Sequence, residues 1–217
     1  MIIRPYLNNK TMKKIITLVA AIAFATTAFS QWSANFGGNL SQFTGKNSYG
    51  STKFGYQIGF TTYSTKLFSI QPGLFLINKG ATNDKSRTSL NYLQVPINLM
   101  LGYNVNEDWR VVVGAGLYGS LGLWGNIKDD GKKKENGVDF FGRSDDSSTA
   151  WKALDFGWQA VIGIQHERYG LRLAYQPGLA RINGSYNADK NDYSKKGPNA
   201  FNNSFMFTLS YTFGELY

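Results

Sequence analysis

A run of alternating residues near the end of the chain constrains the fold most. Between Ser204 and Phe213, bulky apolar or aromatic residues occupy every second position, and smaller or polar residues fill most positions between them. Successive side chains of a β-strand point to opposite faces, so this run predicts a strand with one apolar and one more polar face. The run contains no charged residue. A strand of this kind is typical of the wall of a membrane-spanning barrel.

Seven earlier segments alternate in the same way, so we predict eight strands. These segments are residues 32–41, 54–61, 68–77, 92–101, 109–121, 155–165 and 168–176. Short connections at 64–66, 104–107 and 166–168 alternate with longer ones near 44–52, 80–89, 125–150 and 183–203. Transmembrane barrels built from sequential hairpins have short periplasmic turns and long outer loops. We therefore predict an all-β fold, an eight-stranded antiparallel up-and-down transmembrane β-barrel.

The first 30 residues predict an export signal. Met12, Lys13 and Lys14 form a positive start, and residues 15–25 form an apolar run shorter than the ~20 residues that a membrane-spanning helix needs. Small residues precede the bond between Ser30 and Gln31, where we expect cleavage. We expect a leader at 1–30, with the signal peptide at 12–30 and translation starting at Met12 rather than Met1, and a barrel domain at 31–217. A buried amphipathic helix is the alternative, but the run lacks a polar face.

The composition fits a barrel in contact with lipid and excludes several other classes. Only 17% of the residues are charged, against about a quarter in a typical soluble domain. The chain has no cysteine, which excludes disulfides and thiolate chemistry. Part of the net charge of +9 belongs to the leader, and the basic run Lys132–Lys134 is flanked by acidic residues. We therefore expect no binding to nucleic acid.

Alternation alone does not say which face points inward. A lipocalin is also an eight-stranded barrel, with its apolar face inside. The interior of eight strands is only wide enough for side chains or one small ligand, and the Gly, Ser, Gln and Asn face fits there better than the aromatic face. Aromatic residues also lie near the ends of the segments, as in the girdles of membrane proteins: Trp32, Trp109, Tyr169, Tyr175 and Phe213. We predict that the apolar face meets lipid in the outer membrane of a Gram-negative envelope.

Three charged residues fall on the polar faces of the predicted strands. They are Arg110, Asp155 and Arg172. A lipid-facing Arg or Lys costs roughly 2–4 kcal/mol at the bilayer midplane, so an inward position is expected. Inside, a charge needs a partner. We predict a structural polar network in the lumen, in which Asp155 pairs with Arg172 or with Arg110.

The sequence offers no complete catalytic constellation. His166 is the only histidine, and the topology places it in a periplasmic turn, away from the outer rim where a barrel enzyme would need its base. The pairs Asp129-Asp130 and Asp145-Asp146 lie in a long loop, where calcium binding is a weaker alternative to solvated carboxylates. We expect no catalytic residue, no cofactor and no metal. A rim enzyme acting on lipid or peptide is the less favoured alternative.

Several short motifs occur in a characteristic order: Gln71-Pro72-Gly73-Leu74 followed by Lys79-Gly80, then Leu90-Asn91-Tyr92-Leu93-Gln94-Val95-Pro96, Gly114-Ala115-Gly116 and Asp155-Phe156-Gly157. In this order the mature chain resembles the PorT-like family of small outer-membrane β-barrels. The resemblance implies an eight-stranded barrel of the OmpX/OmpA type and, for most members, no defined activity. Members usually carry a glutamate where this chain has Gly73, so any role of that glutamate is not transferred. The namesake serves a secretion and gliding apparatus.

These observations favour a structural or interaction barrel that presents its extracellular loops, chiefly 125–150. An accessory subunit of an envelope secretion or gliding machinery is the second hypothesis, which rests on the resemblance. The expected partners are outer-membrane lipid or lipopolysaccharide, and envelope proteins that contact the outer loops. Basic residues assigned to these loops could contact lipopolysaccharide phosphates, although solvated loop charge is the simpler account: Lys79, Lys85, Arg87, Lys195 and Lys196.

Overall fold

The computed structural model describes residues 31–45, 51–82, 86–129, 132–134, 152–182 and 200–214. Its strands are β1 (Gln31–Thr44), β2 (Ser51–Tyr63), β3 (Phe68–Thr82), β4 (Ser86–Asn104), β5 (Trp109–Asp129), β6 (Lys132–Lys134), β7 (Leu154–His166), β8 (Tyr169–Pro177) and β9 (Phe201–Thr212). All except β6 correspond one to one with the eight predicted segments, and β6 is a short strand paired with the end of β5. Among the described residues, no helix is long and apolar enough to cross a membrane.

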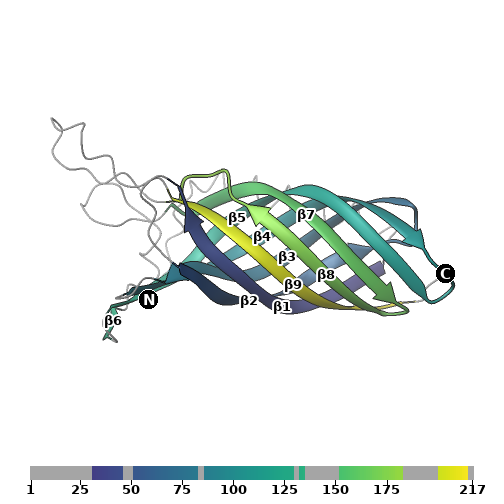
Figure 1. Cartoon of the computed structure of the whole chain (residues 1–217), viewed down its shortest axis with the longest axis horizontal. Coiled ribbons are helices and arrows are strands. Elements are labelled where there is room, and N and C mark those ends of the chain that lie inside the picture. Colours follow the sequence, from purple (N-terminus) through teal and green to yellow (C-terminus); the bar gives the residue numbers. More distant parts are fainter. Residues whose placement is uncertain are drawn as a thin grey trace, which may run out of the picture.

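The eight long strands close into a barrel (Figure 1). Every pairing is antiparallel, in the order β4-β3-β2-β1-β9-β8-β7-β5, and pairing of β4 with β5 closes the ring. The first and last strands meet along most of their length, from Ser33 opposite Thr212 to Thr44 opposite Phe201. Closure removes the free edges, whose unpaired amides would cost several kcal/mol each in hydrocarbon. The predicted eight-stranded antiparallel barrel is confirmed.

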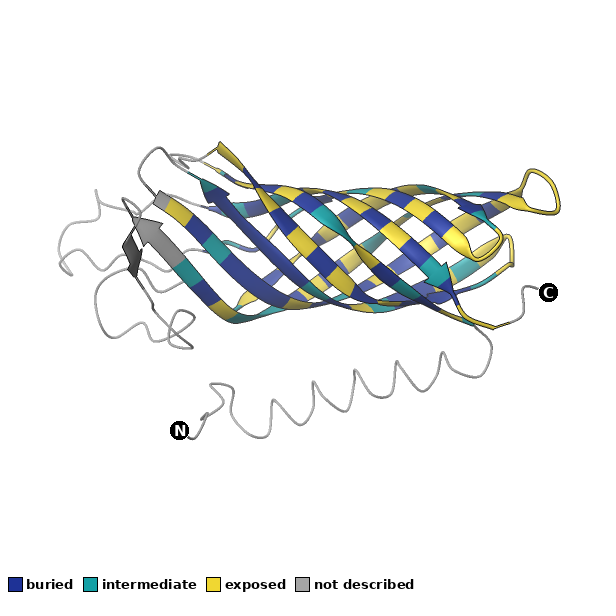
Figure 2. Ribbon diagram, turned by 90° about the horizontal axis from the view of Figure 1, so that it is seen from below, coloured by how far each residue is buried: buried dark blue, intermediate teal, exposed yellow. Residues whose placement is uncertain are grey.

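Exposed and buried residues alternate along the wall (Figure 2). On β9, Phe205 and Phe207 are exposed, whereas Met206 and Thr208 are buried. Every long strand contributes large apolar residues to the outside, and most buried side chains on the inside are polar. The aromatic and aliphatic face therefore points outward, as predicted. A closed barrel with this apolar exterior is suited to the outer membrane.

The two ends of the barrel differ in their connections. The turn end carries the short turns at 64–67, 105–108 and 167–168, together with the start of β1 and the end of β9. The loop end carries the other connections, and β4 and β5 extend beyond the rest of the wall there (Figure 1). Short turns are typical of the periplasmic side, so we assign the turn end to the periplasm.

The connection between β3 and β4 is shorter than predicted. The sequence indicated a loop at 80–89, but the strands stay paired until Thr82 opposite Arg87, which leaves only residues 83–85 between them. The strand continues because residues 77–81 are all buried and β3 stays paired with β4 along them. Because Lys79 is charged, the hydrophobic pattern of the sequence does not indicate that the strand continues past Asn78.

Two apolar clusters divide the interior along its length. At the loop end, eight buried residues pack together: Phe43, Ile77, Ala81, Leu90, Tyr92, Ile182, Ala200 and Met206. Ile182 joins this cluster because the chain beyond β8 runs back along its neighbours, with the Ile182 amide bonded to the Ala200 carbonyl at 2.9 Å. A smaller cluster of Met100, Val112 and Val161, with Ala174 against it, lies farther along the barrel. We call this smaller cluster the apolar partition.

Candidate functional site

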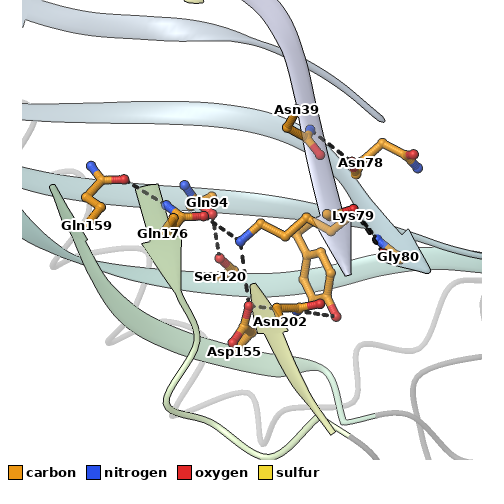
Figure 3. A network of polar contacts seen from close by, with 12 residues as sticks. Asn39, Asn78, Lys79, Gly80, Gln94, Ser120, Asp155, Gln159, Gln176 and Asn202 are labelled. Atoms are coloured by element: carbon orange, nitrogen blue, oxygen red, sulfur yellow. Dashed lines mark hydrogen bonds and ion pairs between the residues drawn. The ribbon is translucent and has the colours of Figure 1, made fainter. Parts of the chain in front are cut away.

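The centre of the interior polar network is a buried ion pair. Lys79 on β3 extends towards Asp155 on β7, with Nζ 3.7 Å from Oδ2 and both side chains 0% exposed (Figure 3). Lys79 Nζ also donates a hydrogen bond to Gln176 Oε1 at 2.6 Å. The same ammonium lies 4.5 Å from the centre of the Tyr118 ring, within range of a cation–π interaction. A carboxylate, an amide and an aromatic face thus surround one cation.

Amide side chains extend this pair into a chain that links five strands. Gln176 donates to Gln159 Oε1 at 2.7 Å, and Gln159 donates to Asn98 Oδ1 at 2.6 Å. On the other side, Asn202 Nδ2 donates to Asp155 Oδ2 at 2.9 Å (Figure 3). The network therefore connects β3, β4, β7, β8 and β9 through the interior. The network can stabilise the barrel, because most of its hydrogen bonds join strands that are not neighbours in the wall.

A second group of polar side chains forms hydrogen bonds to the backbone of β3 where its pairing with β2 is interrupted. The register of these strands shifts between Thr52 and Gln57, so β3 lacks ladder partners on this side. Two β1 side chains take their place. Asn39 Nδ2 donates to the Asn78 carbonyl at 3.1 Å, and Ser41 Oγ contacts the Gly80 carbonyl at 3.0 Å and accepts from the Gly80 amide at 2.9 Å. Buried backbone groups need such partners, so β1 completes the β3 ladder.

The turn end of the interior holds two buried arginines. Arg110 donates to the backbone carbonyls of Thr65 and Lys66 at 2.7 and 2.6 Å, and to Asn104 Oδ1 at 2.6 Å. Gly102 makes room for it, because a Cβ at that position would lie 1.9 Å from Arg110 Nη2. Arg172 is 6% exposed, and neither its Nε nor its Nη2 has a hydrogen-bond partner.

The three predicted network residues are buried in the interior, but their predicted pairing is wrong. Asp155 faces Ser120 on β5, whereas Arg172 faces Gly163 on β7. Asp155 and Gly163 are eight residues apart on β7, or about 26 Å at ~3.3 Å per residue. Arg110 lies farther still along the wall, opposite Gln165. Strand register therefore keeps both arginines away from Asp155.

Lys79 is the partner that sequence reasoning missed. We expected it in an outer loop, in contact with lipopolysaccharide, but its side chain is fully buried in the lumen. The signal was present in the alternation of Phe75, Ile77 and Lys79 on one face. Of the other basic residues assigned to loops, Arg87 is exposed near the loop end. Lys85, Lys195 and Lys196 lie outside the described residues.

The remaining predicted residues are placed as follows. His166 ends β7 at the turn end, with its ring centre 4.5 Å from that of Trp109. Asp129 ends β5, and Asp130, Asp145 and Asp146 are outside the described part of the chain. Within the described part, no group of three or more His, Asp or Glu side chains could hold a metal ion. Ser30 is also outside it, and Gln31 begins β1, so cleavage at this bond and the boundaries 1–30 and 31–217 stay predictions.

Comparisons with known proteins support the fold and go no further. No family model matches the chain, and no curated protein matches it. Among solved structures, Neisserial surface protein A is similar with a TM-score of 0.50 and 8% identity, over 84% of this chain and 97% of that chain. Ail of Yersinia pestis has a TM-score of 0.42 and 11% identity, over 85% and 99%. The N-terminal barrel domain of Pseudomonas aeruginosa OprF has a TM-score of 0.34 and 12% identity, over 85% and 99%.

The likeness to Neisserial surface protein A supports the fold. Together with the closed wall and the apolar exterior, it describes an eight-stranded β-barrel of the outer membrane. Membership of the PorT-like family stays a prediction.

Proposed function

We propose that this protein is a structural or interaction barrel that anchors in the outer membrane and presents its loop-end connections to a partner, without catalysing a reaction. The observation that carries the proposal is the filled interior. The Lys79–Asp155 pair lies among residues of the loop-end cluster, since Asn202 bonds to both Asp155 and Tyr92, and the apolar partition lies nearer the turn end. Eight strands leave room for little else, which argues against an aqueous channel.

Because the loop-end half of the lumen is filled, a partner outside the cell can reach only the outer wall and the connections at that end. The wall is apolar and suited to lipid. The turns at 64–67, 105–108 and 167–168 are short, whereas residues 135–151 and 183–199 connect strands at the loop end and are much longer. Long connections carried by a rigid scaffold are the usual place for binding residues. The expected contacts are lipopolysaccharide around the wall and envelope proteins at the loops.

The resemblance to PorT-like barrels supports a narrower proposal, an accessory role in an envelope secretion or gliding machinery. Its most specific motif, Leu90 to Pro96, forms the middle of β4 and is paired with both β3 and β5. This motif thus belongs to the wall, so a contribution to partner binding would have to come from the attached loops.

Loop replacement tests the proposal. Residues 136–150 would be replaced by a short Gly-Ser linker, with replacement of residues 184–198 as the matched control. We expect both variants to keep the heat-modifiable gel mobility of a folded barrel, and the first to lose the envelope proteins that co-purify with the wild type after cross-linking. A variant without this loop that retains the same partners would contradict the proposal. Loss of a lipid modification on deletion of the protein would instead favour the rim enzyme.

A further inference from the structure

Arg172 is a buried cation without a counter-charge in the described part of the chain. In that part of the chain, an ion pair joins Lys79 to Asp155, which lies nearer the loop end than the apolar partition. Arginine stays protonated in proteins, so this charge cannot be removed by loss of a proton. A buried charge of this kind is costly unless something compensates it.

The free donors of Arg172 have the geometry for an oxyanion. Nε and Nη2 lie on one edge of the guanidinium plane, and these are the two nitrogens without partners. Two parallel N–H groups on such an edge match two oxygens of a carboxylate or a phosphate. Halides and single carbonyl oxygens would occupy only one of the two positions.

Neighbouring interior positions supply further donors. Gly170 pairs with Gln165 on β7 and with Ser210 on β9. The side chains of Gln165 and Ser210 therefore lie on either side of Gly170, which has no side chain. A Cβ on Gly170 would lie 2.3 Å from Ser210 Oγ and 3.6 Å from Gln165 Nε2, so both side chains reach that position. Ser210 Oγ is buried without a partner, and of the two polar atoms of the Gln165 amide only Nε2 can donate. A hydroxyl and an amide can both donate to an anion.

The surroundings of Arg172 favour negative charge. Arg110 faces Gln165 across the β5–β7 pairing, so a second guanidinium lies at the same end of the lumen. The described acidic residues at this end, Glu107, Asp108 and Glu167, are exposed in the turns. On β7, Val161 of the apolar partition lies between Asp155 and Gly163, the residue that faces Arg172. The turn end is therefore the nearer opening for a ligand of Arg172.

We propose that the turn-end half of the lumen is an anion site, in which Arg172 binds two oxygens of a carboxylate or phosphate group and Ser210 and Gln165 donate further hydrogen bonds. This site does not depend on what the outer loops bind. It gives the barrel a ligand-dependent element on the side assigned to the periplasm.

Thermal unfolding tests the site with inorganic anions. The barrel, purified in detergent, would be heated in phosphate, acetate or chloride at one ionic strength, and the midpoint read from its heat-modifiable mobility. We expect phosphate or acetate to raise the midpoint above that in chloride. R172M and R172K should lose this difference, since neither side chain offers a fork of two N–H groups. R168Q, which changes an exposed arginine in the adjacent turn, should keep it.

A measurement on the wild type guards against variants that fail to fold. The phosphorus resonance of inorganic phosphate should broaden on addition of the barrel, and acetate should reverse the broadening if the site accepts carboxylates. A midpoint that is equal in all three anions, or a difference that survives R172M, would overturn the proposal. Absence of phosphate and acetate binding in the resonance experiment would overturn it as well, and would leave water as the partner of Arg172.

Discussion

The two halves of the barrel interior handle buried positive charge in opposite ways. In the loop-end half, Lys79 has a carboxylate, an amide oxygen and an aromatic ring around it. In the turn-end half, Arg110 bonds to neutral oxygens, and Arg172 has two donors without partners. The apolar partition lies between them. The loop-end half also buries Lys53, which donates to the neutral Asn78 Oδ1. The described residues thus form an ion pair in the loop-end half and none in the turn-end half.

The difference shows that an inward position does not by itself define a role. Lys79 and Arg172 are both buried cations on the interior face of the same wall. The first fastens strands together, because its partners come from other strands. Two donors of the second, Nε and Nη2, bond to no other strand, and a residue of this kind is a candidate for binding. Four changes would break or sharpen this comparison.

Removal of the carboxylate from the loop-end half should have the largest effect. D155N leaves the Lys79 ammonium buried without a counter-charge, and loss of one partner of a buried pair costs about 3–5 kcal/mol. Urea unfolding of the barrel in lipid vesicles would measure this loss. D108N, at an exposed turn position, should change the free energy of unfolding by less than about 0.5 kcal/mol. Equal stability of D155N and the wild type would show that the ion pair contributes nothing.

An arginine on the outside measures what an unpaired guanidinium costs in lipid. Ile162 is exposed on β7 and faces Leu173, next to the Gly163–Arg172 pair. I162R should make folding into a bilayer less favourable by roughly 2–4 kcal/mol, with a smaller loss if the position lies near the interface. I162L is the matched control and should fold normally. Folding of I162R as efficient as that of I162L would contradict the outward position of this face.

Replacement of both charges should recover most of what D155N loses. In the double variant K79M/D155L, apolar side chains of similar size fill the same space, and such exchanges are often neutral or stabilising. We expect a stability within about 1–2 kcal/mol of the wild type, which urea unfolding in the same vesicles would show. A double variant as unstable as D155N would mean that the amide chain, and not the charge pair, is the main support.

The smallest effect is expected in the β7–β8 turn. Glu167 has a φ of 49°, a conformation that favours glycine. E167G should stabilise the barrel by up to about 1 kcal/mol, measured as the shift in unfolding midpoint. Arg168 does not have a positive φ, so R168G should leave the stability unchanged or lower it slightly. If E167G brings no gain, backbone strain does not limit the stability of the turn end.

The fold was predictable because alternation reports strand and face together. Phe205 and Phe207 on one side and Thr208 and Ser210 on the other are enough to orient β9. The partners inside were not predictable in this way. Lys79 and Asp155 meet across the lumen because of the lengths and stagger of strands that are far apart in the sequence. Hairpin adjacency of β7 and β8 predicts a pairing of Asp155 with Arg172, but the strand register rules it out.

The hydrogen bonds from β1 side chains to the backbone of β3 have a consequence for how the wall can be assembled. The carbonyls of Asn78 and Gly80 obtain hydrogen bonds from Asn39 and Ser41, not from the adjacent strand. A hairpin of β2 and β3 alone would therefore carry bare carbonyls into hydrocarbon, where each is costly. The smallest part of the wall in which the Asn78 and Gly80 carbonyls are hydrogen-bonded therefore contains β1, β2 and β3. We expect these three strands to enter the membrane together.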